Sequence, residues 1–588
     1  MEWLEERQLL TWVATFVNST GALTIQGVGT SSDTGVLKVD PNSGEILLDG
    51  NNSGNFADTG ANLATINSTI QIQAGTTINS NFIIDNNAGA FFEAPANFPA
   101  NAPMFNYTGS SALDPNDSLT IRGTAGVANT FEVALSAGSN QVANGTTTGL
   151  AGVPPKAGQP EGVLLAQPPN QLNQRNELLV TFGPDPNVPN STGITGHLIL
   201  DGMSSGTNSQ LYIDDAGAIL NPSNPGTPSS AGAASDWTLN GNTITGPQLL
   251  TPTSPPTPTP PPGTAGNITY ANMDGLHFND TVGGEHLFVN SVATNTFASD
   301  AAANTTVVNY KQPLAFPFSL QGSLGGKATL DIVGAANGNN SFYVDSHTVA
   351  LAPTGTKPQY NTPFTHLGAD LTYTVGSLAN LNVSGNGGNN IFNVQVPPTL
   401  IAPYTSDVLP ANLTVYGGSL PPVLAGTQSP PVTPGTSNLL RVLGNGPGPL
   451  TTGADNITVQ DLAANNNGTN AGNVIQMSGI AGVVIYGEGG NDALTNASVG
   501  NPKTGQPAVS ALLIGGDGND TLTGGGGSDM MLGGGGQNTL ISKTSGTVGA
   551  KMTTNYFFPH QDQFGNIYDP LLNPSDGDTT SVVTGAGG

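Results

Sequence analysis

The sequence predicts an all-β fold, in which short strand units stack as a β-solenoid or β-roll with Gly/Asn-rich turns and little helix. Apolar residues alternate in short runs, which indicates strands with one buried face. Gly and Asn or Asp follow these runs, and these residues tolerate the positive φ of tight turns. The unit recurs along the chain, and a unit of this size buries its apolar face only by stacking on its neighbours.

The recurring unit reads apolar-x-apolar-x-Gly, then a short stretch, then Asn or Asp, then a second alternating apolar pair. Its spacing is irregular, which leaves a β-sandwich-like array as the alternative to a solenoid. Units open at Leu23, Leu119, Leu198, Leu330, Leu381, Leu413, Leu440 and Val483, and the turn residues assigned to them include Asn129, Asn208, Asn340, Asn390, Asn456 and Asp492.

Composition excludes several classes of function. The chain has 12 Lys and Arg against 39 Asp and Glu, so we expect no nucleic-acid partner, because phosphate binding needs clustered basic side chains. An acidic surface suits divalent cations instead. The absence of Cys excludes disulfides, a thiolate zinc site and a cysteine nucleophile. No run of about 18 apolar residues is present, so we expect no transmembrane helix.

Composition also suggests domain boundaries. A Pro/Thr-rich segment at 249–264 reads as an extended polyproline II linker that separates two bodies. Residues beyond 545 lose the repeats and are expected to form a loosely ordered tail. We expect an N-terminal export-type segment at 1–18, a β-rich repeat region at 19–248 and the linker at 249–264. A second β-rich repeat region at 265–480, a calcium-binding RTX-like repeat region at 481–545 and the tail at 546–588 follow.

The export-type segment is assigned from a short motif. Residues 4–10 read Leu-Glu-Glu-Arg-Gln-Leu-Leu, which resembles the LEPR-x-LL segment found near the start of large exported bacterial proteins, with Glu6 where that family has Pro. The Arg-rich stretch that accompanies the motif in that family is missing. The alternative for this region is a short amphipathic helix from Trp3 to Phe16, packed on the first coil.

A strict nonapeptide, Gly-Gly-x-Gly-x-Asp-x-apolar-x, begins at Gly515 and repeats at Gly524 and Gly533. It resembles the RTX, or haemolysin-type, calcium-binding repeat. In such a repeat the Gly-rich residues form a turn and the other three form a short strand, so Ca²⁺ can collect carbonyl and carboxylate oxygens between stacked turns. The predicted metal-binding residues are Gly515, Asp517, Gly518, Asp520, Gly524, Gly527, Asp529, Gly533, Gly536, Asn538 and Asp492.

The resemblance also implies roles for individual residues. Consecutive RTX turns alternate between two sides, so turns 515 and 533 would share an ion with Asp520 as its principal carboxylate. Asn538 replaces a second carboxylate with a neutral amide, and Asp529 would face the other side. The turn at Gly487 matches less well because Glu488 replaces the second Gly. We interpret the Asn-bearing units upstream as neutral members of the same series; the alternative is that all these turns are metal-free.

We expect an exported, non-enzymatic surface or extracellular protein of a bacterium, with a structural or adhesive role and with cell-surface or matrix components as partners. The first alternative is a polysaccharide-acting β-helix enzyme with a degenerate calcium-binding cap, and the second is a passive matrix protein without metal. No His-Glu-x-x-His motif is present, and we assign no Gly-x-Ser-x-Gly nucleophile elbow. His277 and His286, near Asp280 and Glu285, are interpreted as loop polarity, so no catalytic residue is predicted.

Overall fold

The structure is a computed structural model in which the chain forms two compact units, unit 1 (Met1–Ala302) and unit 2 (Ala303–Gly588). Each unit is a stack of strands with its own core. The described residues are 12–28, 34–74, 80–86, 105–108, 118–135, 162–166, 177–182, 197–215, 236–245, 267–280, 286–300, 304–321, 328–351, 367–374, 377–396, 409–410, 412–420, 437–444, 455–462, 473–500, 507–544, 560–561, 567–568 and 579–584.

Unit 1 contains two sheets, which we name A1 and B1. Sheet A1 consists of β1 (Trp12–Val17), β2 (Ala22–Gly27), β6 (Ile70–Gln73), β8 (Phe105–Thr108), β10 (Thr130–Leu135), β11 (Gly162–Ala166), β12 (Glu177–Phe182), β14 (Gln210–Asp215), β18 (Gly275–Asp280) and β20 (Asn295–Asp300). Sheet B1 consists of β3 (Thr34–Val39), β4 (Glu45–Asp49), β5 (Ala57–Asn62), β7 (Asn81–Asp85), β9 (Ser118–Arg122), β13 (His197–Asp201), β15 (Asp236–Gly241), β16 (Thr243–Thr245), β17 (Asn267–Ala271) and β19 (His286–Val292).

Unit 2 also contains two sheets, A2 and B2, and a separate hairpin of β39 (His560–Gln561) and β40 (Ile567–Tyr568). Sheet A2 consists of β22 (Phe318–Gln321), β24 (Ser341–Val344), β25 (Thr348–Leu351), β26 (Leu367–Tyr373), β28 (Ile391–Gln395), β30 (Leu439–Leu443), β33 (Gly482–Gly489), β35 (Ser510–Asp517) and β37 (Met530–Gly535). Sheet B2 consists of β21 (Thr305–Tyr310), β23 (Ala328–Gly334), β27 (Leu378–Ser384), β29 (Asn412–Tyr416), β31 (Asn456–Asp461), β32 (Asn473–Ser478), β34 (Ala493–Asn496), β36 (Thr521–Thr523), β38 (Thr539–Thr544) and β41 (Thr579–Thr584).

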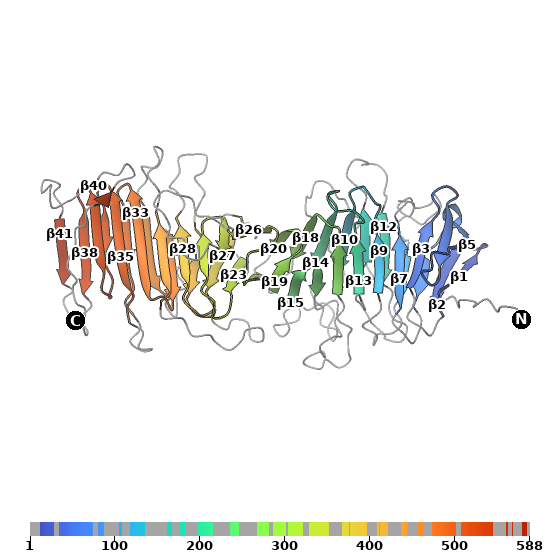
Figure 1. Ribbon diagram of the computed structural model, residues 1–588, viewed down its shortest axis with the longest axis horizontal. Coiled ribbons are helices and arrows are strands. Elements are labelled where there is room, and N and C mark those ends of the chain that lie inside the picture. Colours follow the sequence, from blue (N-terminus) through green and yellow to red (C-terminus); the bar gives the residue numbers. More distant parts are fainter. Residues whose placement is uncertain are drawn as a thin grey trace, which may run out of the picture. The chain divides into compact units, whose positions relative to one another are not determined.

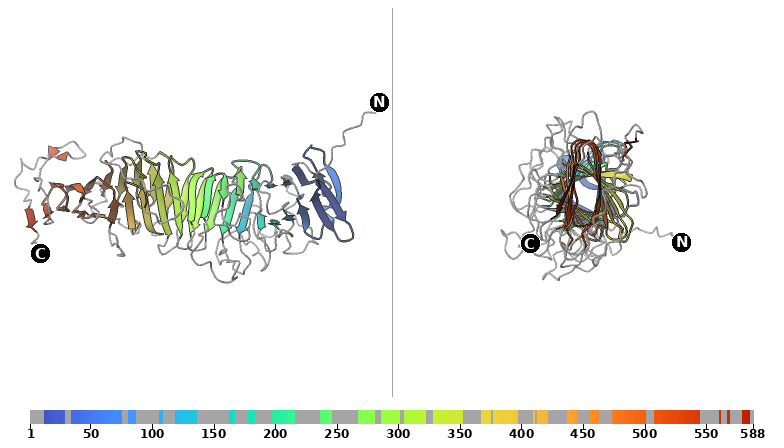
Figure 2. Two further views of the ribbon diagram at one scale, coloured as in Figure 1. Left: turned by 90° about the horizontal axis from the view of Figure 1, so that it is seen from below. Right: turned by 90° about the vertical axis from the view of Figure 1, so that its left-hand side faces the viewer.

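The C-terminal coils of unit 2 show how the chain is wound (Figure 1). It alternates between the sheets, so β33, β35 and β37 pair in parallel in A2, while β34, β36 and β38 pair in parallel in B2. Seen end-on, these coils, coloured brown to red, form two flat walls (Figure 2). This arrangement confirms the predicted β-solenoid or β-roll. Among the described residues the one helical turn is the 3₁₀ turn η1 (Leu63–Thr65), and no helix has the length and apolarity needed to cross a membrane.

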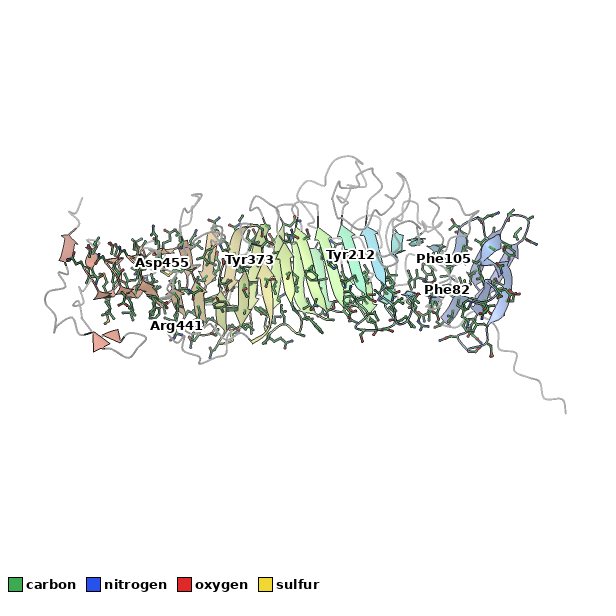
Figure 3. The ribbon with its side chains drawn as sticks, turned by 90° about the horizontal axis from the view of Figure 1, so that it is seen from above. Phe82, Phe105, Tyr212, Tyr373, Arg441 and Asp455 are labelled. Atoms are coloured by element: carbon green, nitrogen blue, oxygen red, sulfur yellow. The ribbon has the colours of Figure 1, made fainter. Side chains whose placement is uncertain are left out.

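The core of each unit lies between its two sheets, because alternate side chains of each strand point inward. In unit 1, Phe82 and Phe105 are completely buried (Figure 3). In unit 2, the rings of Phe342 and Phe392 stack on adjacent coils with their centroids 5.6 Å apart. The last coils are filled by smaller aliphatic and Met side chains, in A2 by Ile485, Leu513 and Met531, and in B2 by Leu494, Leu522 and Leu540.

The expected separation into two bodies at 249–264 is contradicted by strand pairing within unit 1. The segment itself lies outside the described residues, but the strands on either side of it pair with one another. β13 pairs in parallel with β17 over its whole length, β14 pairs likewise with β18, and β15 pairs with β19. The composition of a linker describes only the linker, and it does not reveal whether the flanking strands are neighbouring rungs of one sheet.

Both expected terminal segments also need correction. Residues 12–17 form strand β1, which pairs antiparallel with β2 and buries Trp12 to 2% exposure, so the alternative of a helix extending to Phe16 is wrong and the expected 1–18 segment includes part of the fold. The motif at 4–10 lies outside the described residues. In the expected tail, β41 pairs in parallel with β38, so 579–584 belong to sheet B2.

Truncation of a stacked core ring tests this packing. Phe392→Ala should lower the free energy of unfolding by about 3–5 kcal/mol, because it leaves a cavity against Phe342. Urea unfolding followed by circular dichroism measures the loss. Phe316, which is 41% exposed, provides the control, and its change to Ala should cost less than about 0.5 kcal/mol. Equal losses in the two variants would contradict the assignment of the core.

Candidate metal site

Three Gly-rich turns stack on one edge of unit 2, where the chain passes from sheet A2 to sheet B2. They are 487–492, 515–520 and 533–538, and each follows a strand of A2. The stack is in register, with Glu488 opposite Gly516 and Gly516 opposite Gly534. Main-chain hydrogen bonds run from Gly490 N–H to Asp517 O (2.9 Å) and from Gly518 N–H to Gly535 O (3.0 Å). The predicted pairing of turns 515 and 533 is therefore present, with a third turn stacked on turn 515.

The second Gly of each repeat is required by two independent constraints. Gly516 and Gly534 have φ of +107° and +92°, values that L side chains rarely adopt. A Cβ on Gly516 would lie 2.1 Å from Glu488 O, and one on Gly534 would lie 2.0 Å from Gly516 O. The turns therefore approach one another through their main chains, which places the carbonyl groups of one turn against the next.

A ladder of hydrogen bonds joins the last residue of each turn to the corresponding residue of the next. Asp455 N–H donates to Asp492 Oδ1 (2.8 Å), and Asp492 N–H donates to Asp520 Oδ1 (2.9 Å). Asp520 N–H donates in turn to Asn538 Oδ1 (2.8 Å). One side-chain oxygen of each acceptor is thus fixed by the main chain of the preceding coil, and this directs its other terminal atom toward the following coil.

The second carboxylate oxygens of Asp492 and Asp520 are buried and have no hydrogen-bond partner. The two residues are only 2% and 1% exposed. A Cβ on Gly515 would lie 2.2 Å from Asp520 Oδ2 and 2.4 Å from Gly533 O. Likewise, a Cβ on Gly487 would lie 2.4 Å from Asp492 Oδ2 and 2.5 Å from Gly515 O. Between turns 487 and 515, and between turns 515 and 533, a carboxylate oxygen and a carbonyl oxygen therefore lie near the same point with no hydrogen-bond donor between them. We call these two spaces gaps.

On the opposite edge of unit 2, a similar ladder is formed by Asn turns. We call each turn residue of a ladder a rung, and an Asn residue in this position a neutral rung. The same main-chain ladder runs from Asn340 to Asn390 Oδ1 (2.9 Å) and from Asn390 to Asn438 Oδ1 (2.8 Å). The amide group then donates to the carbonyl that opens the next turn, as from Asn340 Nδ2 to Gly385 O (2.9 Å) and from Asn438 Nδ2 to Gly479 O (2.9 Å). Asp in place of Asn removes this donor, so a proton or a cation must take its position.

Burial makes the charged form of these carboxyls unfavourable. It raises the pKa of Asp520 from 3.8 to about 7, opposed by the hydrogen bond from the main chain of Asp492 and reinforced by the charges of Asp492 and Asp517. It likewise raises the pKa of Asp492 to about 6. A buried carboxylate near neutral pH requires compensation, and a cation coordinated by Oδ2 supplies it.

The atoms that line these gaps fit calcium. Ca²⁺ takes six to eight hard oxygen ligands, including carboxylates and main-chain carbonyls in flexible geometry. Asp492 Oδ2 with Gly515 O, and Asp520 Oδ2 with Gly533 O, are oxygen donors of this kind. Within the described part of the chain, no group of three or more His, Asp or Glu side chains forms a metal site by itself. Main-chain carbonyls would therefore have to supply much of the coordination.

Residues 512–540 match the family model of the RTX calcium-binding nonapeptide repeat. These residues are RTX calcium-binding repeats. They bind Ca²⁺, and Asp520 Oδ2 and Gly533 O are two oxygens of this segment that the geometry brings together. Comparison of the chain with curated proteins and with solved structures gives no significant match. The family match thus covers the last coils of unit 2, and Asp492 precedes it.

Three of the predicted ligands lie on the other edge of the RTX stack. Asp529, with Gly524 and Gly527, belongs to the turn that joins β36 to β37. Its carboxylate is held by protein donors, namely the N–H groups of Ala511 (2.9 Å) and Gly525 (2.7 Å) and the Nδ2 of Asn496 (2.8 Å). Asp529 therefore does not share the gap of Asp520, and its hydrogen bonds give it a role in fixing the turn.

The remaining predicted residues lie in the two stacked RTX turns. Asp517 is exposed at the end of β35, so it contributes charge near Asp520 but faces solvent. Gly518 and Gly536 stack closely, since a Cβ on Gly536 would lie 2.2 Å from Gly518 O. Asn538 is 1% exposed, and its Nδ2 donates to Gly534 O (3.3 Å).

Two acidic residues of the stack were missed as candidates from the sequence. In the turn after β30, the residue that joins the ladder is Asp455, whereas the repeat pattern had assigned its neighbour Asn456. Glu488 is 6% exposed inside the stack and occupies a Gly position. An acidic residue at a position that should be Gly was the available signal for Glu488. The Asn turns at 340, 390 and 438 are not earlier members of this series, because they lie on the opposite edge.

One spacing typical of catalytic serines is also present in the sequence and was not assigned above. Residues 202–206 read Gly-Met-Ser-Ser-Gly, which fits Gly-x-Ser-x-Gly. In the structure they form a turn between two strands, β13 and β14, whereas a nucleophile elbow joins a strand to a helix. Ser204 Oγ accepts a hydrogen bond from the N–H of Gly126 in the neighbouring coil (3.1 Å), so it has a role in the contact between coils.

His277 was interpreted from the sequence as loop polarity. In the structure it lies in strand β18, where its ring stacks between the rings of Tyr212 and Phe297, with centroids 4.3 and 4.9 Å away.

The raised pKa values predict an unusual pH dependence. In calcium-free solution, the folded chain keeps protons on Asp492 and Asp520 that the unfolded chain has released, so stability should fall as pH rises from about 4 to about 7. Calcium must displace these protons, so its stabilising effect should be greatest above about pH 7 and weaken below it. Thermal unfolding with calcium and with a chelator, from about pH 5 to about pH 8, measures both trends. A calcium-free Tm that does not change over this range would contradict the assignment.

Exchange of a single atom should convert an RTX rung into a neutral one. In Asp520→Asn the new amide can donate to Gly533 O, so calcium-free stability should rise by about 1 kcal/mol and most of the calcium response should disappear. The matched reverse variant is Asn390→Asp, which should lower stability at neutral pH because its carboxylate would face Gly417 O. Chemical unfolding with and without calcium gives both values. An unaltered calcium response in Asp520→Asn would exclude Asp520 as a ligand.

Proposed function

We propose that this is an exported, non-enzymatic bacterial protein of the extracellular space or cell surface, with a structural or adhesive role that depends on calcium. The observation that carries the proposal is the pair of buried, unpartnered Oδ2 atoms of Asp492 and Asp520, which face carbonyl oxygens in a stack that is otherwise hydrogen-bonded. Such a stack closes most stably around a cation. Calcium is therefore part of the folded end of unit 2.

The concentration of calcium explains why export fits this design. Extracellular calcium-binding modules have dissociation constants of about 10⁻⁴–10⁻³ M, so they fill outside the cell and stay empty where calcium is scarce. RTX repeats are typical of secreted proteins. Without the ion, repulsion between carboxylate and carbonyl oxygens favours an open segment, and calcium closes it after export.

A structural or adhesive role is supported by the repetitive architecture. From β33 to β38 each coil of unit 2 adds one strand to each wall, so the same outward positions recur along the sheet. On B2 these positions present hydroxyl groups in two rows, Thr521 with Thr539 and Thr458 with Thr495. A regular polar face of this kind can bind an extended surface through many weak contacts. Cell-surface or matrix components are the partners that we propose.

Two measurements on the full chain test the proposed function together. Millimolar calcium should raise both the β-sheet signal and the Tm, and calcium-loaded protein should bind bacterial cells or matrix preparations more strongly than the same protein in chelator. Incubation with cell-wall and matrix polysaccharides should release no new reducing ends. Release of reducing ends would overturn the proposal in favour of a polysaccharide-acting enzyme, and calcium-independent stability would remove its central element.

A further inference from the structure

The outer face of sheet A2 is apolar over its last three strands. In β33, β35 and β37 the residues that alternate with those of the core point outward, and they form two rows in register. The side chains of both rows are only partly buried. One row is Val484, Leu512 and Met530, and the other, two residues further along each strand, is Tyr486, Ile514 and Leu532. Contiguous apolar side chains on an outer face are characteristic of binding surfaces.

The opposite wall shows that the coils do not require apolar residues at outward positions. On sheet B2, in the same coils, the outward positions include Thr521 of β36 and Thr539 of β38, which lie side by side in register. Parallel strands of the same stack therefore accept hydroxyl side chains there. The aliphatic rows of A2 are not needed to form the coil, and they remain in contact with water unless a partner covers them.

One end of the first row carries a cation without a partner. Arg441 of β30 lies opposite Val484, so it continues this row, and Asn393 of β28 lies opposite Arg441. Arg441 Nη1 and Asn393 Oδ1 are both buried without a hydrogen-bond partner, so the two side chains do not satisfy one another. Within the described residues, Arg441 forms no ion pair. A charged donor that is removed from water without an acceptor is costly, so this end of the row requires an anion.

The row has the same order of groups as an anionic amphiphile. Its polar end is a guanidinium group, and the next three strands each add one aliphatic side chain. Neighbouring strands lie about 4.8 Å apart, so the row from Arg441 to Met530 is about 14 Å long. An extended saturated chain of this length can lie along the row and contact the second row with its side.

We propose that the outer face of sheet A2 binds a fatty acid, with its carboxylate at Arg441 and its acyl chain along Val484, Leu512 and Met530. A guanidinium group binds a carboxylate through two parallel hydrogen bonds. The single charge of a carboxylate matches the single cation, whereas a phosphate monoester carries nearly two charges. This site is separate from the calcium-binding turns, and it adds a ligand to those of the proposed function.

Two other occupants match the charges less well. In a face-to-face contact between two copies of the chain, neither apolar row offers a carboxylate to Arg441. An anionic bilayer would meet the whole chain, whose net charge of −27 repels it. A single fatty acid meets only the charges near the row. Glu488 is four residues beyond Val484 on β33, which places it about 13 Å away along the strand.

The first test measures binding of dodecanoate, a saturated fatty acid of about the length of the row. The full chain is kept in millimolar calcium, because β35 and β37 belong to the RTX coils. Equilibrium dialysis with radiolabelled dodecanoate, at micromolar concentrations that avoid calcium soaps, should show saturable binding. Hexanoate, which covers only part of the row, should bind at least about tenfold more weakly. Dodecanol, which lacks the charge, should also bind at least about tenfold more weakly.

Variants of the two parts of the site should have different effects. Arg441→Gln should weaken dodecanoate binding about tenfold and leave dodecanol binding unchanged. Leu512→Thr, which gives A2 a side chain typical of the B2 face, should weaken binding of both ligands. Lys311→Gln removes an exposed positive charge elsewhere in unit 2, so it is the control and should bind like the wild type. Calcium should stabilise all three variants as it stabilises the wild type, which separates a failure of this proposal from a failure of the proposed function.

The results that would overturn the proposal are equally specific. They are the absence of saturable dodecanoate binding in the wild type, and equal binding in the wild type and both A2 variants. A dimer that Leu512→Thr dissociates, seen by sedimentation velocity in place of dodecanoate binding, would assign the face to self-association. Pelleting with phosphatidylglycerol vesicles that Leu512→Thr abolishes, again in place of dodecanoate binding, would assign it to a bilayer.

Discussion

The structure depends on one recurring hydrogen bond, from the main-chain N–H of a turn residue to a side-chain oxygen of its counterpart in the next coil. In unit 1 it joins Asn129 to Ser209 and Ser209 to Asp274. In unit 2 separate ladders on the two edges use the same bond, through Asn390 on one edge and Asp520 on the other. The acceptor must be a short side chain with an oxygen, so Asn, Asp and Ser serve equally. This bond fixes the register of the coils while leaving the second terminal atom free to vary.

That second atom decides the chemistry of each rung. In Asn it is an NH₂ group, which donates to the carbonyl of the next turn and completes a metal-free contact, as for Asn340 and Gly385. In Asp492 and Asp520 it is an oxygen, which faces the same kind of carbonyl without a donor, as for Asp520 and Gly533. Burial of an unpaired charge is costly, so the Asp rung is stable only with a proton or a cation. The Asn rung and this kind of Asp rung thus differ by one terminal atom.

The sequence predicted the features that depend on local patterns. Alternating apolar residues and Gly-rich turns predicted stacked strands, and the strict nonapeptide predicted the contact between turns 515 and 533. It did not reveal the register of coils with long insertions, so Asn456 was assigned in place of Asp455, and the Pro-rich segment at 249–264 was taken as a boundary between bodies whose strands in fact pair. Glu488 was treated only as a defect in a repeat, because Asp455, one of the two acids whose charges act on it, comes from a turn that is distant in sequence.

The ladder of hydrogen bonds also connects the metal-free coils of unit 2 with the acidic coils that follow them. Each rung donates its N–H to an acceptor in the next coil, so ordering one turn fixes the partner that its neighbour requires, as in a chain of nearest-neighbour interactions. The coils that contain Asn390 and Asn438 complete their contacts without metal, so they can fold in the absence of calcium. The coils of Asp492 and Asp520 each carry an acid whose Oδ2 faces a carbonyl without a donor, so their closure depends on the preceding coil and on a proton or an ion. We therefore expect the acidic coils to fold after the neutral ones, to an extent that increases with the calcium concentration.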